Sequence, residues 1–166
     1  MDIPALEFKD FVIKRAASRK EIGELVRLIG KLNGKNAVIQ IFDSKRIANR
    51  VHLAGAYANA LITFKNHTNR TRSVAMEMLL FAAMTDQIGD AIDMVGAKSS
   101  SDFVLFADKK AAFAKVKPVL KIKSEFEASP AHTKSVAAAF GIKGSKTELI
   151  NAKILQKMAL SRLNSN

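Results

Sequence analysis

The 166-residue chain contains no cysteine and no tryptophan, and it has a single tyrosine. Without cysteine there are no disulfide bridges, no thiolate metal sites and no cysteine nucleophile, which is typical of a reducing compartment. The other aromatic residues are 10 phenylalanines. The core must therefore be built from Phe, Leu, Ile, Val and Ala.

Long apolar runs are also absent. No segment approaches the roughly 18 apolar residues that a membrane span requires. Residues 1–10 contain Asp2, Glu7 and Asp10, so they do not have the pattern of a secretory signal. We expect a cytoplasmic protein without a membrane partner.

Catalytic motifs are missing as well. The three histidines, His52, His67 and His132, are not spaced as metal ligands, and no H-E-x-x-H, G-x-S-x-G, P-loop or G-x-G-x-x-G motif occurs. Asp86 and Asp90 have the i, i+4 spacing that would let them hold a hard cation, but a solvated first helical turn explains them more simply. We expect no catalytic residue, metal, cofactor or small-molecule substrate.

The chain does carry a large positive charge. It has 27 Lys and Arg against 15 Asp and Glu, a net charge of +12, with 48% apolar and 25% charged residues. The apolar and charged fractions are typical of a folded globular protein. A protein this basic usually binds a polyanion, most often nucleic acid and less often an anionic membrane. The alternative is that the basic surface serves only solubility.

Residue patterns predict the fold. Short β-branched and apolar runs favour strands at residues 11–17, 36–43, 102–108 and 119–125. Apolar periodicity and N-cap signals at Ser18, Ser44, Ser129 and Ser145 favour helices between the strands and after them. We predict an α+β fold, one domain over residues 1–166, with a small central β-sheet packed by several helices and a C-terminal helix.

The most informative segment lies between Asp43 and Glu77, because no other acidic residue occurs between these two. Because the charged side chains between these two residues are all basic, the segment produces a positive local electrostatic potential. The basic side chains of the segment are Lys45, Arg46, Arg50, Lys65, Arg70 and Arg72.

Within this segment a helix to about residue 65 places Arg46, Arg50 and Tyr57 on one face and an apolar stripe that includes Val51 and Leu61 on another. A basic face with one aromatic ring suits phosphate contact and base stacking, and a solvated face with Tyr57 half-buried is the alternative. His52 lies among small residues, which indicates a hydrogen-bonded structural histidine packed close to another helix.

Arg70 and Arg72 are expected in or near the first turn of the next helix. Cations there oppose the helix dipole, but the free N–H groups of a helix start bind anions. The two arginines therefore predict a phosphate or terminal-ribose pocket, unless they pair with Glu77 or with an acid elsewhere. A second basic run, residues 109–123, either extends the positively charged surface available to a large RNA or only keeps a surface soluble.

The predicted terminal helix is apolar on two sides. One side carries Ile150, Ile154 and Met158, and the nearly opposite side carries four apolar residues: Leu149, Ala152, Leu160 and Leu163. A surface helix of a monomer needs one apolar stripe, so the second predicts a protein partner, unless the helix is buried on both sides within its own domain.

Several short runs, in this order, resemble the PRPK-binding-protein family, the small kinase-binding subunit of the KEOPS complex, in its archaeal form. They are Ile39-Gln40-Ile41-Phe42-Asp43, His52-Leu53-Ala54, Asn69-Arg70-Thr71, Ala75-Met76-Glu77-Met78-Leu79-Leu80, Gln87-Ile88, Ala91-Ile92 and Lys157-Met158-Ala159-Leu160. The similarity spans roughly residues 36–163.

The resemblance implies a non-catalytic protein with two partners. One is the KEOPS kinase/ATPase subunit, bound largely through the terminal helix. The other is the 3′ CCA end of tRNA, captured for threonylcarbamoyladenosine modification. The expected tRNA-binding residues are Arg70, Arg72, Lys65, Arg46, Arg50 and Tyr57, and the expected kinase-binding residues are Ile150, Ile154, Met158 and Lys157.

Two alternatives stay open at this point. A generic basic RNA-binding protein would bind RNA without a kinase partner. A small enzyme with a site assembled in three dimensions would show a deep pocket with convergent, strongly perturbed acids or histidines.

Overall fold

A four-stranded antiparallel sheet organises the computed structural model, which describes residues 10–163. The strand order is β2-β3-β1-β4, so β3 and β1 are central and β2 and β4 are the edges. The strands are β1 (Val12–Ser18), β2 (Ile39–Phe42), β3 (Phe103–Ala107) and β4 (Leu120–Glu125). β2 and β3 lie inside their predicted segments, β1 is shifted by one residue from its segment, and β4 begins one residue later than predicted.

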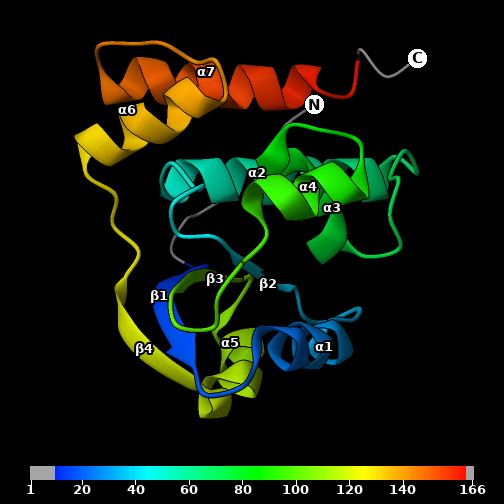
Figure 1. The fold of residues 1–166 in the computed structure, drawn as a ribbon. Helices are drawn as coiled ribbons and strands as arrows, with labels where there is room; N and C mark the ends of the chain where they lie inside the picture. Colours follow the sequence, from blue (N-terminus) through cyan, green and yellow to red (C-terminus); the bar gives the residue numbers. More distant parts are fainter. Residues whose placement is uncertain (1–9, 164–166) are drawn as a thin grey trace.

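Helices cover both faces of this sheet in layers (Figure 1). Below the sheet in that view lie α1 (Ile22–Leu32) and α5 (Lys110–Val116), followed by the 3-10 turn η1 (Lys117–Val119). Above it lie α2 (Arg50–Lys65), α3 (Val74–Ala83) and α4 (Ile88–Val95). The outermost layer is α6 (Pro130–Ala139) and α7 (Thr147–Leu160), which packs on α2. The predicted α+β arrangement with a C-terminal helix is confirmed.

The central strand β3 shows how the sequence builds two apolar clusters. All five of its residues are buried. Because side chains alternate between the faces of a strand, Phe103 and Leu105 pack with α1 and α5, whereas Val104 and Phe106 pack with the helices of the other face. The sheet is therefore covered at its centre, and exposed side chains lie mainly in loops, on outer helix faces and on the edge strand β4.

Two helices begin later than the sequence predicts because other residues cap them. Asn49, rather than Ser44, caps α2, and its side chain accepts a hydrogen bond from the N–H of His52. The Ser44 hydroxyl instead donates to Asp102 at 2.6 Å. Ser73 caps α3 by accepting from the Met76 N–H, so the preceding residues form a loop.

The cap predictions at Ser18 and Ser145 are also wrong, whereas the cap at Ser129 is confirmed. Ser18 ends β1, and its hydroxyl donates to the Val119 carbonyl at 2.8 Å. The residue before α7 is Lys146, and no side chain caps that helix. Ser129 accepts from the His132 N–H as expected.

His52 is the structural histidine that its neighbours predict. It is fully buried, its Nδ1 accepts from the Ala48 N–H at 3.1 Å, and its Nε2 therefore donates to the Ala82 carbonyl at 2.8 Å. Its ring lies edge-on to Phe140, with 5.6 Å between centroids. At Gly55 an added Cβ would collide with the Leu155 side chain, so this glycine allows α7 to approach α2 closely.

We expect the stability of the protein to fall by about 2 kcal/mol between pH 7 and pH 5 because of His52. Burial lowers the pKa of His52 from 6.5 to about 4, although its hydrogen bond to Ala82 acts in the opposite direction. Between those values the unfolded chain binds the proton and the folded chain does not. The stability is therefore fully present above pH 6.5 and is lost as the pH falls toward 4.

Urea unfolding at several pH values measures this slope. In a His52→Gln variant, which cannot titrate, the loss between pH 7 and pH 5 should shrink to a fraction of that in the parent protein. The same loss in both proteins would assign the slope to other groups.

Candidate nucleic-acid and partner surfaces

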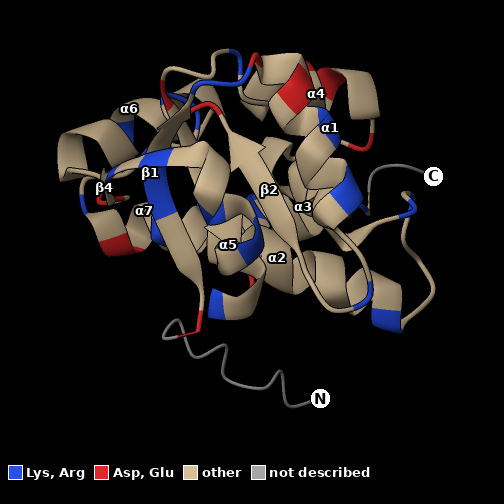
Figure 2. Cartoon of the chain, turned by 90° about the horizontal axis from the view of Figure 1, so that it is seen from below, with Lys and Arg blue, Asp and Glu red and all other residues tan. Residues whose placement is uncertain are grey.

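The positive charge is not confined to one side of the molecule. Figure 2 shows Lys and Arg on several elements, β1 among them, and acidic residues on α4. On β1 both basic side chains are paired, Lys14 with Glu125 and Arg15 with Asp102, the second pair with Nε–Oδ1 at 2.7 Å. Net charge alone therefore does not locate a binding surface. A candidate surface has to be identified from the exposure and the ion-pair partners of each basic side chain.

The loop between α2 and α3, residues 66–73, carries the two arginines singled out in the sequence. They lie before the helix and not in its first turn, because α3 begins only at Val74. The Arg70 side chain is 40% exposed and pairs with Asp86, with 3.0 Å between Nη1 and Oδ2. Arg72 is exposed. We call residues 66–73 the basic loop; Lys65 at the end of α2 adjoins it.

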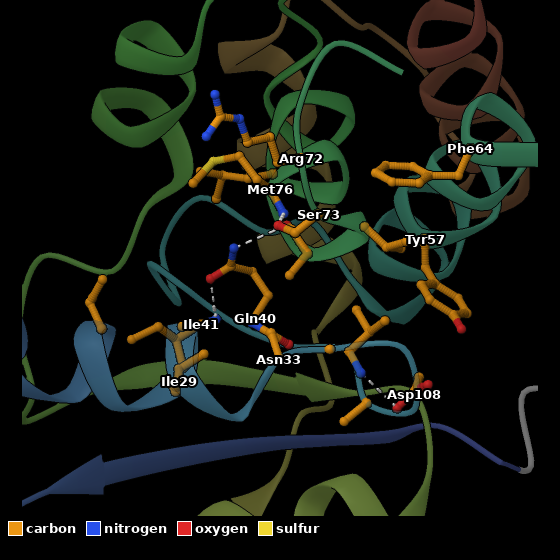
Figure 3. Close-up of a pocket in the computed structure, with 18 of the residues that line it drawn as sticks. Ile29, Asn33, Gln40, Ile41, Tyr57, Phe64, Arg72, Ser73, Met76 and Asp108 are labelled. Atoms are coloured by element: carbon orange, nitrogen blue, oxygen red, sulfur yellow. Dashed lines mark hydrogen bonds between the residues drawn. The ribbon is translucent and has the colours of Figure 1, made fainter. Parts of the chain in front are cut away.

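A cavity of about 650 Å³ opens beside Arg72 (Figure 3). It lies between α1, β2, the end of α2 and the start of α3, and Figure 3 shows Arg72 beside Met76, across the cavity from Ile29 and Ile41 in this view. Most of its wall is apolar, with Val26, Ile29, Leu61, Phe64, Met76 and Leu79 among the lining residues. The side chain of Gln40, a polar residue of the wall, already forms hydrogen bonds within the protein: its amide donates to the Ala75 carbonyl and accepts from the Ile41 N–H.

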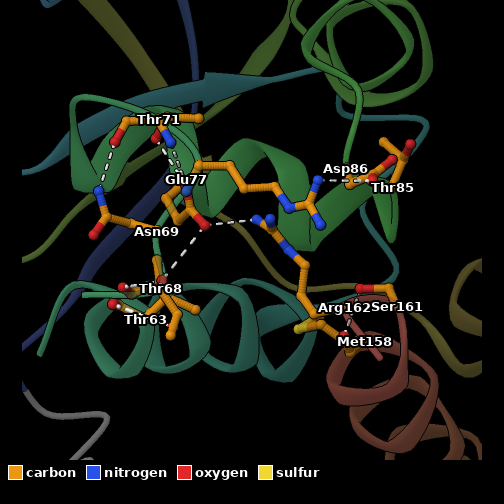
Figure 4. A network of polar contacts seen from close by, with 12 residues as sticks. Thr63, Thr68, Asn69, Thr71, Glu77, Thr85, Asp86, Met158, Ser161 and Arg162 are labelled. Atoms are coloured by element: carbon orange, nitrogen blue, oxygen red, sulfur yellow. Dashed lines mark hydrogen bonds and ion pairs between the residues drawn. The ribbon is translucent and has the colours of Figure 1, made fainter. Parts of the chain in front are cut away.

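Glu77 holds the basic loop from the side of α3 (Figure 4). Its side chain is fully buried. Oε2 accepts three hydrogen bonds, from the Arg70 N–H at 3.1 Å, the Thr71 N–H at 3.0 Å and the Thr71 hydroxyl at 2.9 Å. Thus the expected alternative, pairing of Arg70 with Glu77 or another acid, is realised in two parts: its backbone binds Glu77 and its side chain binds Asp86.

Glu77 has a further partner in Arg162, just beyond α7. Its Nη2 donates to Glu77 Oε1 at 2.6 Å, and its guanidinium lies 4.6 Å from the centre of the Phe81 ring. Burial lowers the pKa of Arg162, against the raising effect of Glu77. Sequence reasoning missed this contact; its only signal was an arginine at the end of a helix that is apolar on two sides.

The basic residues expected to bind tRNA fall into two groups. Arg50 begins α2 and Lys65 ends it, which separates them by about 22 Å at the rise of an α-helix. Arg50 lies 3.8 Å from Glu125, and Arg46 is exposed in the turn before α2. Lys65, Arg70 and Arg72 therefore lie together within residues 65–72, at and just after the end of α2, whereas Arg46 and Arg50 belong to the other end of the helix.

The prediction that Tyr57 lies on an open basic face of α2 is wrong. Tyr57 is only 8% exposed, and its ring packs against Phe11 and Phe106 with centroid distances of 5.3 and 5.1 Å. Burial, with a smaller contribution from Asp108, raises the pKa of Tyr57 to about 12. The helix lies between the sheet and α7, and all residues from 52 to 57 are buried. Tyr57 lines the cavity from below its surface and is not part of an open basic face.

The predicted orientation of α7 is also wrong. Ile150, Ile154 and Met158 are at most 2% exposed, because they pack inward with α2 and α6. Lys157 is exposed, and its ammonium donates to the Phe140 carbonyl. The opposite side is open to solvent, and we call it the outer face of α7: Leu149, Ala152, Leu160 and Leu163. Its three leucines are 46%, 45% and 69% exposed.

Neither a metal cluster nor a membrane helix is found in residues 10–163. No three His, Asp or Glu side chains of that range are grouped as metal ligands. No helix within it is both long and apolar enough to cross a membrane. Asp86, which the sequence placed near Asp90 as a cation candidate, instead pairs with Arg70.

A family model described as kinase binding protein CGI-121 matches residues 18–162, from the end of β1 to just beyond α7. The chain belongs to this family. The match confirms the kinase-binding family that the sequence resembles, and the CGI-121 region includes both the basic loop and the outer face of α7. No curated protein matches the chain.

Proposed function

We propose that this CGI-121 protein is a non-catalytic subunit of the KEOPS complex that binds its kinase/ATPase subunit and captures the 3′ CCA end of tRNA for threonylcarbamoyladenosine modification. The observation that carries the proposal is an exposed apolar row on the terminal helix of a protein that belongs to a kinase-binding family.

The outer face of α7 supports the kinase contact. Exposed leucines repeated on one side of a helix make a poor solvent surface and a good protein surface. Leu149 and Leu160 lie three turns apart and are both about half exposed. We place the kinase there, in place of the inward-facing residues that the sequence favoured.

The basic loop and its cavity support the tRNA contact. Phosphates of an unpaired RNA end are best held by arginine, and its unstacked bases need an apolar or aromatic surface. Arg72 at the edge of a largely apolar cavity offers both within one site, and Arg70 and Lys65 lie close to it along the chain. Arg46 and Arg50, at the other end of α2, would contact a different part of a large RNA.

A non-catalytic role agrees with the positions of the histidine and the carboxylate whose pKa values depart most from normal, His52 and Asp102. Arg15 and Ser44 hold the pKa of Asp102 well below its usual value, against the effect of burial, and they link strand and loop by hydrogen bonds. His52 is fixed between backbone groups in the core. Neither His52 nor Asp102 lines the cavity.

Binding to both partners tests the proposal. The purified protein should co-elute with the KEOPS kinase subunit in size-exclusion chromatography, and tRNA should join that complex. A folded protein that binds RNA but never the kinase would instead be a generic RNA-binding protein.

A further inference from the structure

The buried carboxylate of Glu77 binds both the basic loop and the segment that follows α7. Glu77 lies in the first turn of α3 and is fully buried, and a single oxygen of it accepts from two consecutive backbone N–H groups of the basic loop. Since the backbone of Arg70 and Thr71 is fixed by these bonds, the starting points of the Arg70 and Arg72 side chains are fixed as well (Figure 4).

Such a carboxylate requires a counter-ion, because a buried unpaired charge is strongly unfavourable. The nearby Arg70 guanidinium is turned to Asp86, 3.0 Å away. The guanidinium that reaches Glu77 comes from Arg162, 85 residues further along the chain. Figure 4 shows it extending from the end of α7 to Glu77.

Arg162 is placed for this contact and not for a surface contact. Its side chain is 13% exposed, against 40% for Arg70. One face of its guanidinium lies over Phe81, and its Nε and Nη1 are buried without a hydrogen-bond partner among residues 10–163. Keeping two donors unsatisfied is costly, so the bond to Glu77 and the ring contact must hold this arginine in place.

We propose that Arg162 and Glu77 are positioning residues for RNA binding: the end of α7 holds the basic loop in its RNA-binding conformation through this ion pair. The inference rests on the proposed tRNA contact. It also connects the two proposed surfaces, because Leu160 and Leu163 of the outer face of α7 flank Arg162 in the chain. A protein bound to the outer face of α7 would therefore also contact the helix end from which Arg162 reaches Glu77 and the basic loop.

The test compares two variants that remove the same charge from the same terminal segment. Arg162→Gln removes the counter-ion of Glu77. Lys153→Gln removes a cation whose ammonium bonds only to the Lys143 carbonyl, at 2.6 Å, as far as the described contacts show. Each full-length variant is measured for tRNA affinity at several salt concentrations and for amide hydrogen exchange at Arg70 and Thr71.

We expect Arg162→Gln to weaken tRNA binding about tenfold and to speed exchange at both amides, because Glu77 loses its anchor. Lys153→Gln should change affinity less than twofold and leave those amides protected. The salt dependence of binding should keep its slope in Arg162→Gln, because Arg162 touches no phosphate.

Three outcomes would overturn the inference. One is wild-type exchange at Arg70 and Thr71 in Arg162→Gln. Another is an equal loss of affinity in both variants, which would reduce the effect to net charge. The third is a salt slope reduced by about one, which would make Arg162 a direct phosphate contact.

Two further provisions keep the test decisive. If Arg162→Gln does not fold, the paired variant Glu77→Gln/Arg162→Gln removes both buried charges, and the same exchange and affinity changes are expected of it. If the wild-type protein binds no tRNA at all, the proposed function fails, whereas the hold on the loop is still decided by amide exchange.

Discussion

Replacing Arg70 and Arg72 together with glutamate is expected to weaken tRNA binding at least about a hundredfold, since two phosphate contacts become two repulsions. Both side chains start from the basic loop, and Arg72 also borders the cavity. Neither is part of the core, so the melting temperature should change little. Filter binding or fluorescence anisotropy with labelled tRNA measures the loss, and kinase binding should be retained.

A matched control separates the site from the overall charge. Lys110→Glu/Lys115→Glu makes the same change in net charge on α5, on the opposite side of the sheet, where both lysines are exposed. This control should lose affinity only a fewfold, and the loss should fade with added salt. Equal losses in the two double variants would show that the +12 charge acts as a whole and that the basic loop is no site.

The outer face of α7 gives the second large effect. Leu149→Glu/Leu160→Glu is expected to weaken the kinase complex by at least about a hundredfold, since two apolar contacts at the centre of an interface become buried charges. Both positions are nearly half exposed in the free protein, so the variant should fold and keep its affinity for tRNA. Size-exclusion chromatography and calorimetry with the kinase subunit measure the complex.

Two comparisons make the assignment of this face specific. Ile154→Glu should unfold the protein, because Ile154 is 1% exposed and a charge there would be buried without a partner. Ile88→Glu on α4, which is 44% exposed, should leave the kinase complex intact. If Leu149→Glu/Leu160→Glu binds the kinase like the parent protein, another surface carries this partner.

The sequence predicts the strands well because their signal is local. Residues 36–43 and 102–108 are short, apolar runs, and the structure places β2 and β3 inside them. Helix starts are predicted less well. Serine residues occur before several helices, but a cap requires the side chain to be free, and Ser44 is bound to Asp102, 58 residues away.

In the candidate surfaces, too, the sequence predicts features that depend on local patterns and misses those that depend on contacts between distant segments. Two apolar sides on the terminal helix are visible in the sequence, but which side is covered depends on α2 and α6, so the sequence alone does not identify the exposed side. The burial of Tyr57 is hidden for the same reason, because the residue that packs on its ring is Phe106 of the sheet. Arg70 and Arg72 could be found because their clustering is local, whereas the Arg162–Glu77 pair joins distant segments and leaves no pattern in the chain.

The most direct measurement is binding of intact tRNA and of tRNA lacking its 3′ CCA, at a low and a moderate salt concentration. If the basic loop and its cavity hold the unpaired end, removal of CCA should weaken binding at least tenfold at both salt concentrations. Equal binding of the two RNAs, with salt as the only variable that matters, would contradict the account and would make the protein a non-specific polyanion binder.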